Sequence, residues 1–274
     1  MRQSLGIPIE HHGRVWPYAP ASSGIAMHRH DELEFNLVTA GQARYLFTDR
    51  RYDLAPGTLI WLFPDHDHVL IDQTPDYRMW IVVIRPEALR RLCHGAGSAT
   101  LLERDPQGEI SRQLHADDAR TLASLLRRVA AAEDVDRSNA GLGYVVLEAW
   151  AMFQRAEALT VSQEVHPAVE RAAYLLSSEG QDMTIDQIAR RAGLSSSRLS
   201  RLFKQQVGLT LVAYRNRRRV ERFIECYGRG RRRTVTEAAL EAGFGSYPQF
   251  HRVFREVMNQ SPAEYRQSIE QARG

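Results

Sequence analysis

The last hundred residues of this 274-residue chain contain one short pattern twice, at 188–215 and again at 238–266. Each copy has an alanine-rich segment that ends at a glycine, then an apolar segment with an aromatic-basic pair, and finally a Tyr-Arg pair. Gly193 and Gly243 are 50 residues apart, and the later parts of the two copies are 51 apart. Two helices joined by a glycine turn are typical of a helix-turn-helix that reads DNA. The repeat therefore predicts two such units in tandem and makes nucleic-acid binding the leading interpretation.

The second helix of each copy is expected to present a polar face to solvent. At about 100° per residue, Leu199, Leu202 and Phe203 share one arc, and the apolar residues of 250–257 do the same in the second copy. Because these arcs must be buried, the opposite arcs face outward and can enter a major groove. The residues to which we assign DNA contacts are Ser196, Ser197, Ser200, Arg201 and Lys204 in the first copy and Tyr247, His251, Arg252 and Arg255 in the second.

Several roles remain open for each single residue of these faces. Arg201 or Arg252 can contact a base, a phosphate or only solvent, and a bidentate arginine–guanine contact is worth about 1–3 kcal/mol of discrimination. His251 can touch phosphate as well as a base, and Tyr247 can pack on the sugar-phosphate chain. The sequence alone does not choose between these roles.

Basic charge is concentrated in the half of the chain that holds the repeat. Residues 166–274 contain 19 arginines and lysines against 11 aspartates and glutamates, whereas residues 1–165 contain 17 against 22. A basic half beside an acidic half favours a polyanionic partner for the basic one. Arginines also crowd 212–227 and the loop 229–233 between the copies, where we expect a share of phosphate contacts.

The segment 166–270 resembles the DNA-binding domain of the AraC/XylS family of transcription regulators. The motif that carries the resemblance consists of Ala239, Gly243-Phe244, Phe250, Phe254-Arg255, Ser261-Pro262 and Tyr265-Arg266. The resemblance implies two recognition helices that enter successive major grooves on one face of the duplex. Asn259 replaces the usual glycine, but asparagine tolerates a left-handed backbone. Pro248 falls in a first helical turn, where its missing N–H has no helical partner.

Residues 1–105 have the pattern of antiparallel β-structure. Short apolar or alternating runs at 34–39, 43–48, 58–63 and 79–84 are separated by turn formers, among them Gly41, Asp49-Arg50-Arg51 and Pro56-Gly57. Strands of this length with regular turns predict a sandwich or barrel. We therefore expect an α+β chain of two domains, with an antiparallel barrel at 1–105 and an all-α tandem helix-turn-helix domain at 166–274.

The section between these domains, 106–165, changes to helical period. Segments 117–132 and 142–159 each place apolar residues on one stripe. These helices can pack within the chain or against a partner subunit, so a homodimer stays open. His166-Pro167 marks the next boundary, and Pro167 is expected at the first position of a helix.

One group of residues in the first section resembles the cupin barrel motif: His28-x-His30, Glu34 and Gly41, then Gly57 and His68. The resemblance implies a barrel pocket that senses a ligand. His28 and His30 share a face of a strand, and Glu34 shares it if the strand continues. Three imidazoles and a carboxylate suit a divalent transition metal. His28, His30, Glu34 and His68 are therefore candidate ligand-binding residues and candidate metal ligands, since the same groups can instead hydrogen-bond a small molecule.

Together these features predict a transcription regulator, by family habit an activator, that binds a double-stranded DNA operator and responds to a small-molecule effector or metal. RNA polymerase is then an expected partner. The alternative is a metal-dependent cupin enzyme, an oxygenase or isomerase, built on the same residues. No apolar run of 18 residues predicts a membrane span. Without a secretory signal or cysteine-pair spacing, the chain is expected in the cytoplasm.

Overall fold

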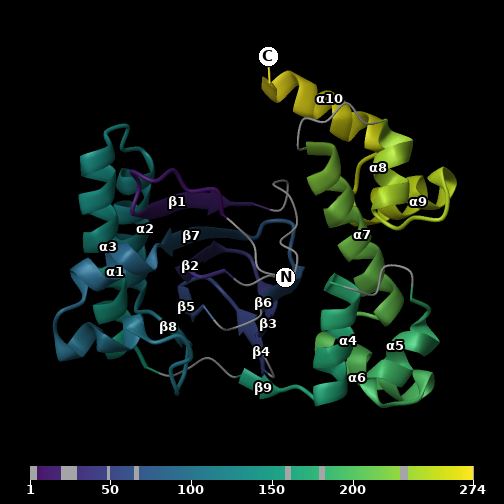
Figure 1. The fold of residues 1–274 in the computed structure, drawn as a ribbon, viewed down its shortest axis with the longest axis horizontal. Coiled ribbons are helices and arrows are strands. Elements are labelled where there is room, and N and C mark those ends of the chain that lie inside the picture. The colour runs from purple at the N-terminus through teal and green to yellow at the C-terminus, as the bar shows by residue number, and fades with distance from the viewer. Residues whose placement is uncertain are drawn as a thin grey trace. The chain divides into compact units, whose positions relative to one another are not determined.

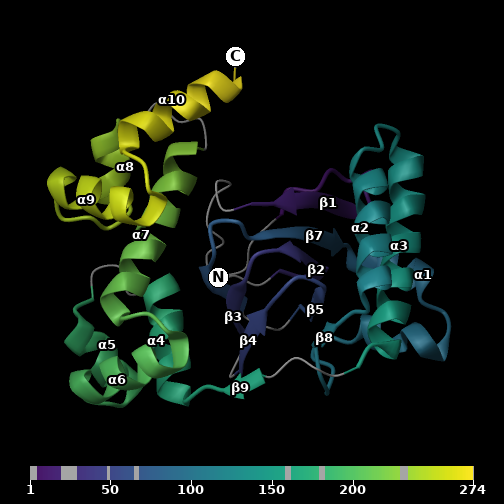
Figure 2. The same cartoon turned by 180° about the vertical axis from the view of Figure 1, so that it is seen from behind.

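The computed structural model describes residues 5–19, 30–47, 50–64, 68–157, 162–178, 183–228 and 234–273. The chain forms two compact units, one from the described residues up to Glu164 and one from Val165 onward. The first unit combines antiparallel sheets with helices and the second is helical, which confirms the expected α+β class (Figures 1 and 2). Within the described ranges, no helix is long and apolar enough to cross a membrane.

Two antiparallel sheets make up most of the first unit. The five-stranded sheet has the order β1-β7-β2-β5-β8, and the four-stranded sheet has the order β6-β3-β4-β9. The strands are β1 (Gly13–Tyr18), β2 (Leu33–Ala40), β3 (Ala43–Phe47), β4 (Arg50–Leu54), β5 (Thr58–Leu62), β6 (His68–Gln73), β7 (Arg78–Ile84), β8 (Ser111–Gln113) and β9 (Ser162–Glu164). The four predicted apolar runs correspond to β2, β3, β5 and β7.

The prediction of a turn at Arg50-Arg51 is wrong. Both arginines lie in β4, where Arg50 pairs with Phe47 and Arg51 with Leu46 of β3. They are half-buried, and each pairs with an acid: Arg50 Nη1 lies 3.3 Å from Glu109 Oε1, and Arg51 Nη2 lies 3.0 Å from Asp53 Oδ2. Two consecutive charged residues therefore suggested a turn where the chain forms a half-buried strand.

Helices cover one face of the five-stranded sheet. They are α1 (Pro86–Leu92), the 3-10 helix η1 (Ala96–Leu102), α2 (Ala116–Ala130) and α3 (Val135–Arg155). The Trp61 ring of β5 lies 5.3 Å from that of Trp150 and 6.4 Å from that of Phe153, both on α3. Arg112 of β8 donates hydrogen bonds of 3.0–3.2 Å to three carbonyls at the end of α3, which caps that helix. The two predicted helices thus pack within the first unit.

The section 106–165 differs in detail from its sequence pattern. The helix expected at 142–159 begins earlier, at Val135, and ends at Arg155. The three-residue strands β8 and β9 also lie in this section and extend the edges of the two sheets. Strands this short carry too few residues to show an alternating pattern.

Seven helices follow in the described part of the second unit: α4 (Pro167–Ser178), α5 (Ile185–Ala192), α6 (Ser196–Val207), α7 (Leu211–Gly228), α8 (Val235–Glu241), α9 (Tyr247–Met258) and α10 (Pro262–Arg273). Pro167 opens α4, as predicted. The α5–α6 pair and the α8–α9 pair lie toward opposite ends of the long helix α7 (Figures 1 and 2). The duplicated pattern therefore builds two similar helical pairs on one shared helix.

The start of each pair uses the same local chemistry. Thr184 caps α5 and Thr234 caps α8, each in a capping box with the side chain three residues later. The threonine hydroxyl accepts a hydrogen bond of 3.2 Å from the backbone N–H of Gln187 or Glu237. The side chain of Gln187 or Glu237 in turn accepts a hydrogen bond from the threonine backbone N–H, at 2.7 or 2.8 Å. These reciprocal bonds satisfy helix donors that would otherwise have no partner.

The change of offset from 50 to 51 residues has a structural cause in the turn. Gly193 and Gly243 both adopt left-handed backbones, with φ of 81° and 89°. The next helix cap, Ser195, follows Gly193 by two residues, whereas Ser246 follows Gly243 by three. The second copy thus has one extra residue between the glycine and the second helix, and the helices themselves keep their register.

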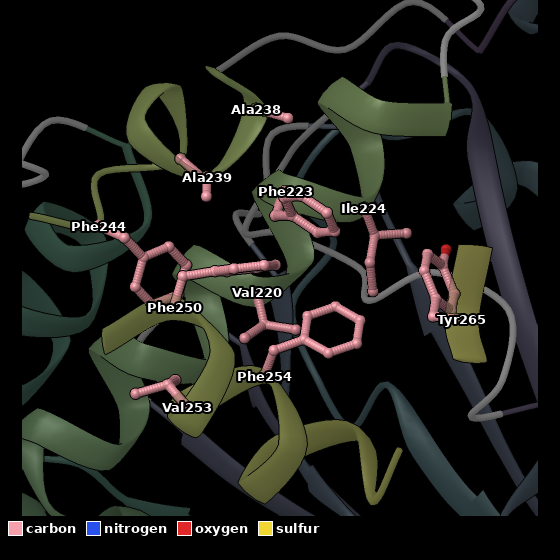
Figure 3. Close-up of a cluster of buried hydrophobic side chains, with 11 residues drawn as sticks. Val220, Phe223, Ile224, Ala238, Ala239, Phe244, Phe250, Val253, Phe254 and Tyr265 are labelled. Carbon is pink, nitrogen blue, oxygen red and sulfur yellow. The ribbon is translucent and has the colours of Figure 1, made fainter. Parts of the chain in front are cut away.

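A buried aromatic cluster fixes the orientation of the second pair on α7. Figure 3 shows Phe223 of α7 facing Phe250 and Phe254 of α9, and the ring centroids lie 4.5 and 5.4 Å apart. The whole cluster is Val220, Phe223, Ile224, Ala238, Ala239, Ala242, Phe244, Phe250, Val253, Phe254 and Tyr265. Because this packing sets the rotation of α9, it also decides which of its residues face outward.

Candidate nucleic-acid interface

The outward face of α6 carries most of the polar residues that the sequence predicted there. Leu199, Phe203 and Val207 are buried on the inner side. The exposed residues of the helix include Ser197, Ser200, Arg201 and Lys204. The face is therefore free for a partner, as its helical period indicated.

Ser196 differs from the other predicted contacts on α6. Its hydroxyl donates a hydrogen bond to the Oδ1 of Asp186 on α5, and the residue is half-buried. This bond joins the two helices of the first pair and occupies the hydroxyl proton. Ser196 therefore has a structural role in the described chain, whatever else it contacts.

The outward face of α9 repeats this arrangement with different side chains. Phe250, Val253 and Phe254 are buried, while Arg252 and Arg255 are exposed. Tyr247 is 41% exposed, and its ring lies 5.8 Å from that of Phe250, so it sits at the edge of the buried side.

His251 was expected on the exposed face of α9, but it is half-buried, with its ring 6.2 Å from that of Tyr247. Two other features of the helix agree with the sequence. Asn259 ends the helix with a left-handed backbone, φ 52°, as predicted for a residue in place of glycine. Pro248 lies in the first turn, where it was expected to be tolerated.

Three exposed cations of these two helices carry charge that no described residue neutralises. Arg201, Lys204 and Arg252 form no ion pair with any residue that the structure describes. Arg255 lies close enough to Glu264 to contribute to the lowered pKa of that carboxyl, which results mainly from hydrogen bonds at Ser261. Unpaired surface cations of this kind can neutralise phosphates.

The arginines of α7 include several that serve the interior instead. Arg218 is 3% exposed and its Nη2 lies 3.0 and 2.9 Å from the two carboxylate oxygens of Glu221. Its guanidinium also stands 5.3 Å from the centre of the Tyr214 ring. Arg218 is therefore not among the arginines of 212–227 that can contact phosphate, because an acid one turn later on the helix pairs with it.

Two other arginines of α7 also make contacts inside the unit. Arg215 donates a hydrogen bond of 3.5 Å to the carbonyl of Met183, and burial lowers its pKa. Arg219 stands 5.9 Å from the ring centre of Phe244. The basic loop 229–233, where we also expected phosphate contacts, lies outside the described residues.

A buried polar cluster occupies the first unit at the start of β2. His30 is 3% exposed, Glu34 5% and Asn36 0%. The His30 Nε2 lies 2.9 Å from Oε2 of Glu34, and Asn36 Nδ2 donates to Oε1 of Glu34 at 2.8 Å. His30 Nδ1 lies 2.9 Å from the carbonyl oxygen of Glu32.

The contacts of His30 decide its protonation. Burial lowers its pKa, but the hydrogen bond and charge of Glu34, with the charge of Glu32, outweigh burial and raise the pKa above 6.5. A carbonyl oxygen only accepts, so Nδ1 must donate to it. Nε2 faces a carboxylate, so the pair is satisfied when Nε2 carries a proton as well.

Asn36 is a residue that the sequence reasoning missed. It follows Glu34 by two positions in β2, so both side chains point to the same side of the sheet. The neighbouring Phe35 points the other way, toward Trp61, 4.7 Å away between ring centres. Asn36 Oδ1 is buried and has no hydrogen-bond partner among the described residues. The period of two within the predicted strand was the signal that could have found it.

Two buried tyrosines lie in the same unit. Tyr45 of β3 and Tyr77 donate to the Sδ of Met79 on β7, at 3.8 and 3.2 Å. Burial raises the pKa of Tyr45, and the nearby charges of Tyr77 and Glu34 add to this effect. Tyr45 and Met79 belong to different sheets, so the side of β2 that carries Glu34 faces the space between the sheets.

The predicted metal set is only partly within the described residues. His28 lies outside them, and His68 opens β6, with its backbone opposite Phe47, but its side chain is not described. We expected His30 and Glu34 on one strand. That expectation is wrong, because β2 begins only at Leu33. Both nitrogens of His30 face oxygen acceptors, so neither directs a lone pair at a shared metal position. Among the side chains described, no cluster of three His, Cys, Asp or Glu residues fits a metal ion.

Comparison with known proteins gives matches to both units. A family model described as a helix-turn-helix domain matches residues 188–268. A second, described as an AraC-like ligand binding domain, matches residues 20–144. Each model covers a separate part of the chain, and the first includes both helix-turn-helix copies.

Relatives are matched over most of their length. The HTH-type transcriptional activator RhaS of Klebsiella pneumoniae (strain 342) is 26% identical over 261 residues, covering 92% of this chain and 91% of that protein. RhaS of Salmonella arizonae is 27% identical over 247 residues, covering 88% of this chain and 87% of its own. The crystal structure of ToxT from Vibrio cholerae has a TM-score of 0.42 and 14% identity, and the match covers 92% of this chain and 96% of that one.

Proposed function

The chain belongs to the AraC/XylS family of transcription regulators, and from this premise we propose that α6 and α9 together recognise one DNA operator. The observation that carries the proposal is the repeated division of the two helices. Each buries one apolar side and exposes a basic side, at positions that match under the 51-residue offset. Two copies of one surface on one rigid helix suit two adjacent grooves of one duplex.

The assigned contacts divide by chemistry. Arg201, Lys204, Arg252 and Arg255 supply positive charge that attracts the DNA polyanion. The residues beside them on the outward faces, Ser197, Ser200, Tyr247 and His251, supply polar and stacking contacts. Charge gives affinity that falls with salt, and contacts to base edges give sequence preference. Ser196 belongs to the same face, with its hydroxyl proton held by Asp186.

The first unit carries the ligand-binding role of the family. We place the effector between the two sheets, where His30, Glu34 and Asn36 form a hydrogen-bonded row. Asn36 Oδ1 is buried there and accepts no hydrogen bond from any described residue. A buried acceptor without a partner is costly, and a ligand that donates to it removes this cost. His28 and His68 stay as proposed members of this site.

A small polar molecule fits this site better than a metal ion does. The three described residues already hydrogen-bond one another, and His30 has both nitrogens engaged. A metal could bind His30 only after one ring nitrogen had given up its oxygen partner and the proton between them. Metal analysis of the purified protein decides between the two ligands.

The remaining partners follow from an activator role. The two RhaS relatives are named transcriptional activators, and an activator acts by promoting the binding or action of RNA polymerase at a promoter. We also propose a homodimer through the outer side of α3, where Tyr144 is 56% exposed. Because its proposed target is a DNA operator, we propose that the protein acts in the cytoplasm.

Genomic footprinting of the purified protein tests the proposal. The expected result is protection of a small set of sites at moderate salt, with the loss of protection in a variant that carries both R201A and R252A. The neighbouring genes would then suggest the effector. Bound metal with catalytic turnover, together with no DNA affinity, would favour the cupin-enzyme alternative, against which the named activator relatives argue.

A further inference from the structure

Two arginines occupy equivalent and central places on the outward faces. Arg201 and Arg252 are each six residues beyond the serine that caps their helix, Ser195 and Ser246. At about 100° per residue, each points within about 30° of the direction opposite the buried side chains of its helix. Both are exposed, and neither is paired with an acid among the described residues.

This central place favours base contact over phosphate contact. When a helix enters a major groove, the middle of its outward face lies over the base edges, and the flanks lie near the sugar-phosphate walls. Lys204 and Arg255 lie three residues further along α6 and α9, farther from the N-terminal residues that contact base edges in a helix-turn-helix. Lys204 also points about 80° away from the direction opposite the buried residues of its helix. Their position along the helices favours phosphates, whereas the two arginines lie nearer the base edges.

We infer that Arg201 and Arg252 each read a guanine, so that the operator has two half-sites that share one guanine at the matching position. The inference rests on the proposed function of the helical unit. Arginine presents two parallel N–H donors to the O6 and N7 acceptors of guanine, and no other base pair offers this pattern in the major groove. Two successive grooves place the two guanines about 10 base pairs apart.

The bases beside these guanines differ between the half-sites. The residue before Arg201 is Ser200, and the residue before Arg252 is the larger and half-buried His251. Ser197 on the first face corresponds to Pro248 on the second, which has no donor at all. The operator is therefore an imperfect repeat, alike at the guanine and unlike around it.

The test begins with selection of bound duplexes from a random library by the full-length wild-type protein. Affinities are then measured by fluorescence anisotropy at one fixed salt concentration for the wild type, R201A, R252A and K204A. Each conserved guanine of the selected operator is replaced in turn by 7-deazaguanine, which lacks the N7 acceptor. Circular dichroism confirms that each variant is folded, as expected for exposed positions.

The expected result is specific to position. One 7-deazaguanine weakens wild-type binding by about 5- to 100-fold and leaves R201A binding unchanged. The other also weakens wild-type binding but leaves R252A binding unchanged. K204A weakens binding to every duplex alike. If both arginine variants instead lose affinity equally for the operator and for a scrambled duplex, the arginines contact phosphate and the inference is overturned, although the regulator still binds DNA. A wild type that selects no sequence would overturn the operator-binding proposal itself.

Discussion

The imidazole of His30 and the carboxylate of Glu34 lie 2.9 Å apart, Nε2 to Oε2, and both side chains are buried. His30 precedes β2, and Glu34 lies at the start of this strand. The position gives the carboxylate a large effect on the protonation of the imidazole, because little water screens the two charges.

Replacing Glu34 by glutamine should lower the pKa of His30. Burial lowers that pKa, and the hydrogen bond and charge of Glu34 are the largest of the contributions that together outweigh it, so their removal lets burial dominate. NMR titration of the His30 ring in the full chain measures the change. E32Q is the matched control and should have the smaller effect, because Glu32 Oε2 lies 3.6 Å away and is more exposed.

The same pair predicts how stability depends on pH. A raised pKa in the folded state favours the charged imidazole, so this stabilisation is complete below pH 6.5 and is lost as the pH rises through the folded-state value. Urea unfolding of wild type and E34Q on both sides of this range measures the difference. A wild-type advantage that instead grew with rising pH would contradict the assignment of charge to His30.

The buried pair of Arg218 and Glu221 predicts a strong and non-additive effect on stability. E221A leaves the Arg218 guanidinium buried without its acid, which should cost about 3–5 kcal/mol. The double variant R218M/E221M removes both charges and should lose much less. Urea unfolding measures both. A double-variant loss equal to or larger than that of E221A would contradict the penalty assigned to an unpaired buried guanidinium.

Substitutions at Asn259 test whether the backbone there is left-handed. Its φ of 52° is a left-handed value, which glycine adopts freely and alanine does not. N259G should therefore be neutral or stabilising by up to about 1 kcal/mol, and N259A should be destabilising by about 1 kcal/mol. Thermal unfolding measures both, with G208A as the matched change at the equivalent site of the first copy, where φ is 85°.

The features predicted well from sequence are those that depend on a few neighbouring residues. Thr184 and Gly193 mark the ends of α5 because capping and left-handed turns are local chemistry. Likewise, the buried and exposed arcs of α6 and α9 follow from helical period alone. The second unit was predictable in outline for this reason.

The features that were missed depend on residues distant in the sequence. Arg218 looked like a surface cation until the packing around Tyr214 and Glu221 was known. Asn36 looked like an ordinary strand residue, and only the opposite sheet shows that its oxygen is buried without a partner. Arg50 and Arg51 looked like a turn because their pairing with β3 cannot be read from composition.

Lys204 predicts a change in the salt dependence of operator binding. It is exposed near the end of α6, and no residue in the described ranges pairs with it. If it neutralises one phosphate, K204A should reduce the slope of log K against log salt concentration by about 0.9, with a similar loss for every sequence. Anisotropy titrations at several salt concentrations measure the slope, and R91A, an exposed arginine of α1 in the first unit, is the control that should leave it unchanged. A slope unaltered in K204A but shifted in R91A would place the phosphate contact on the first unit and remove Lys204 from the interface.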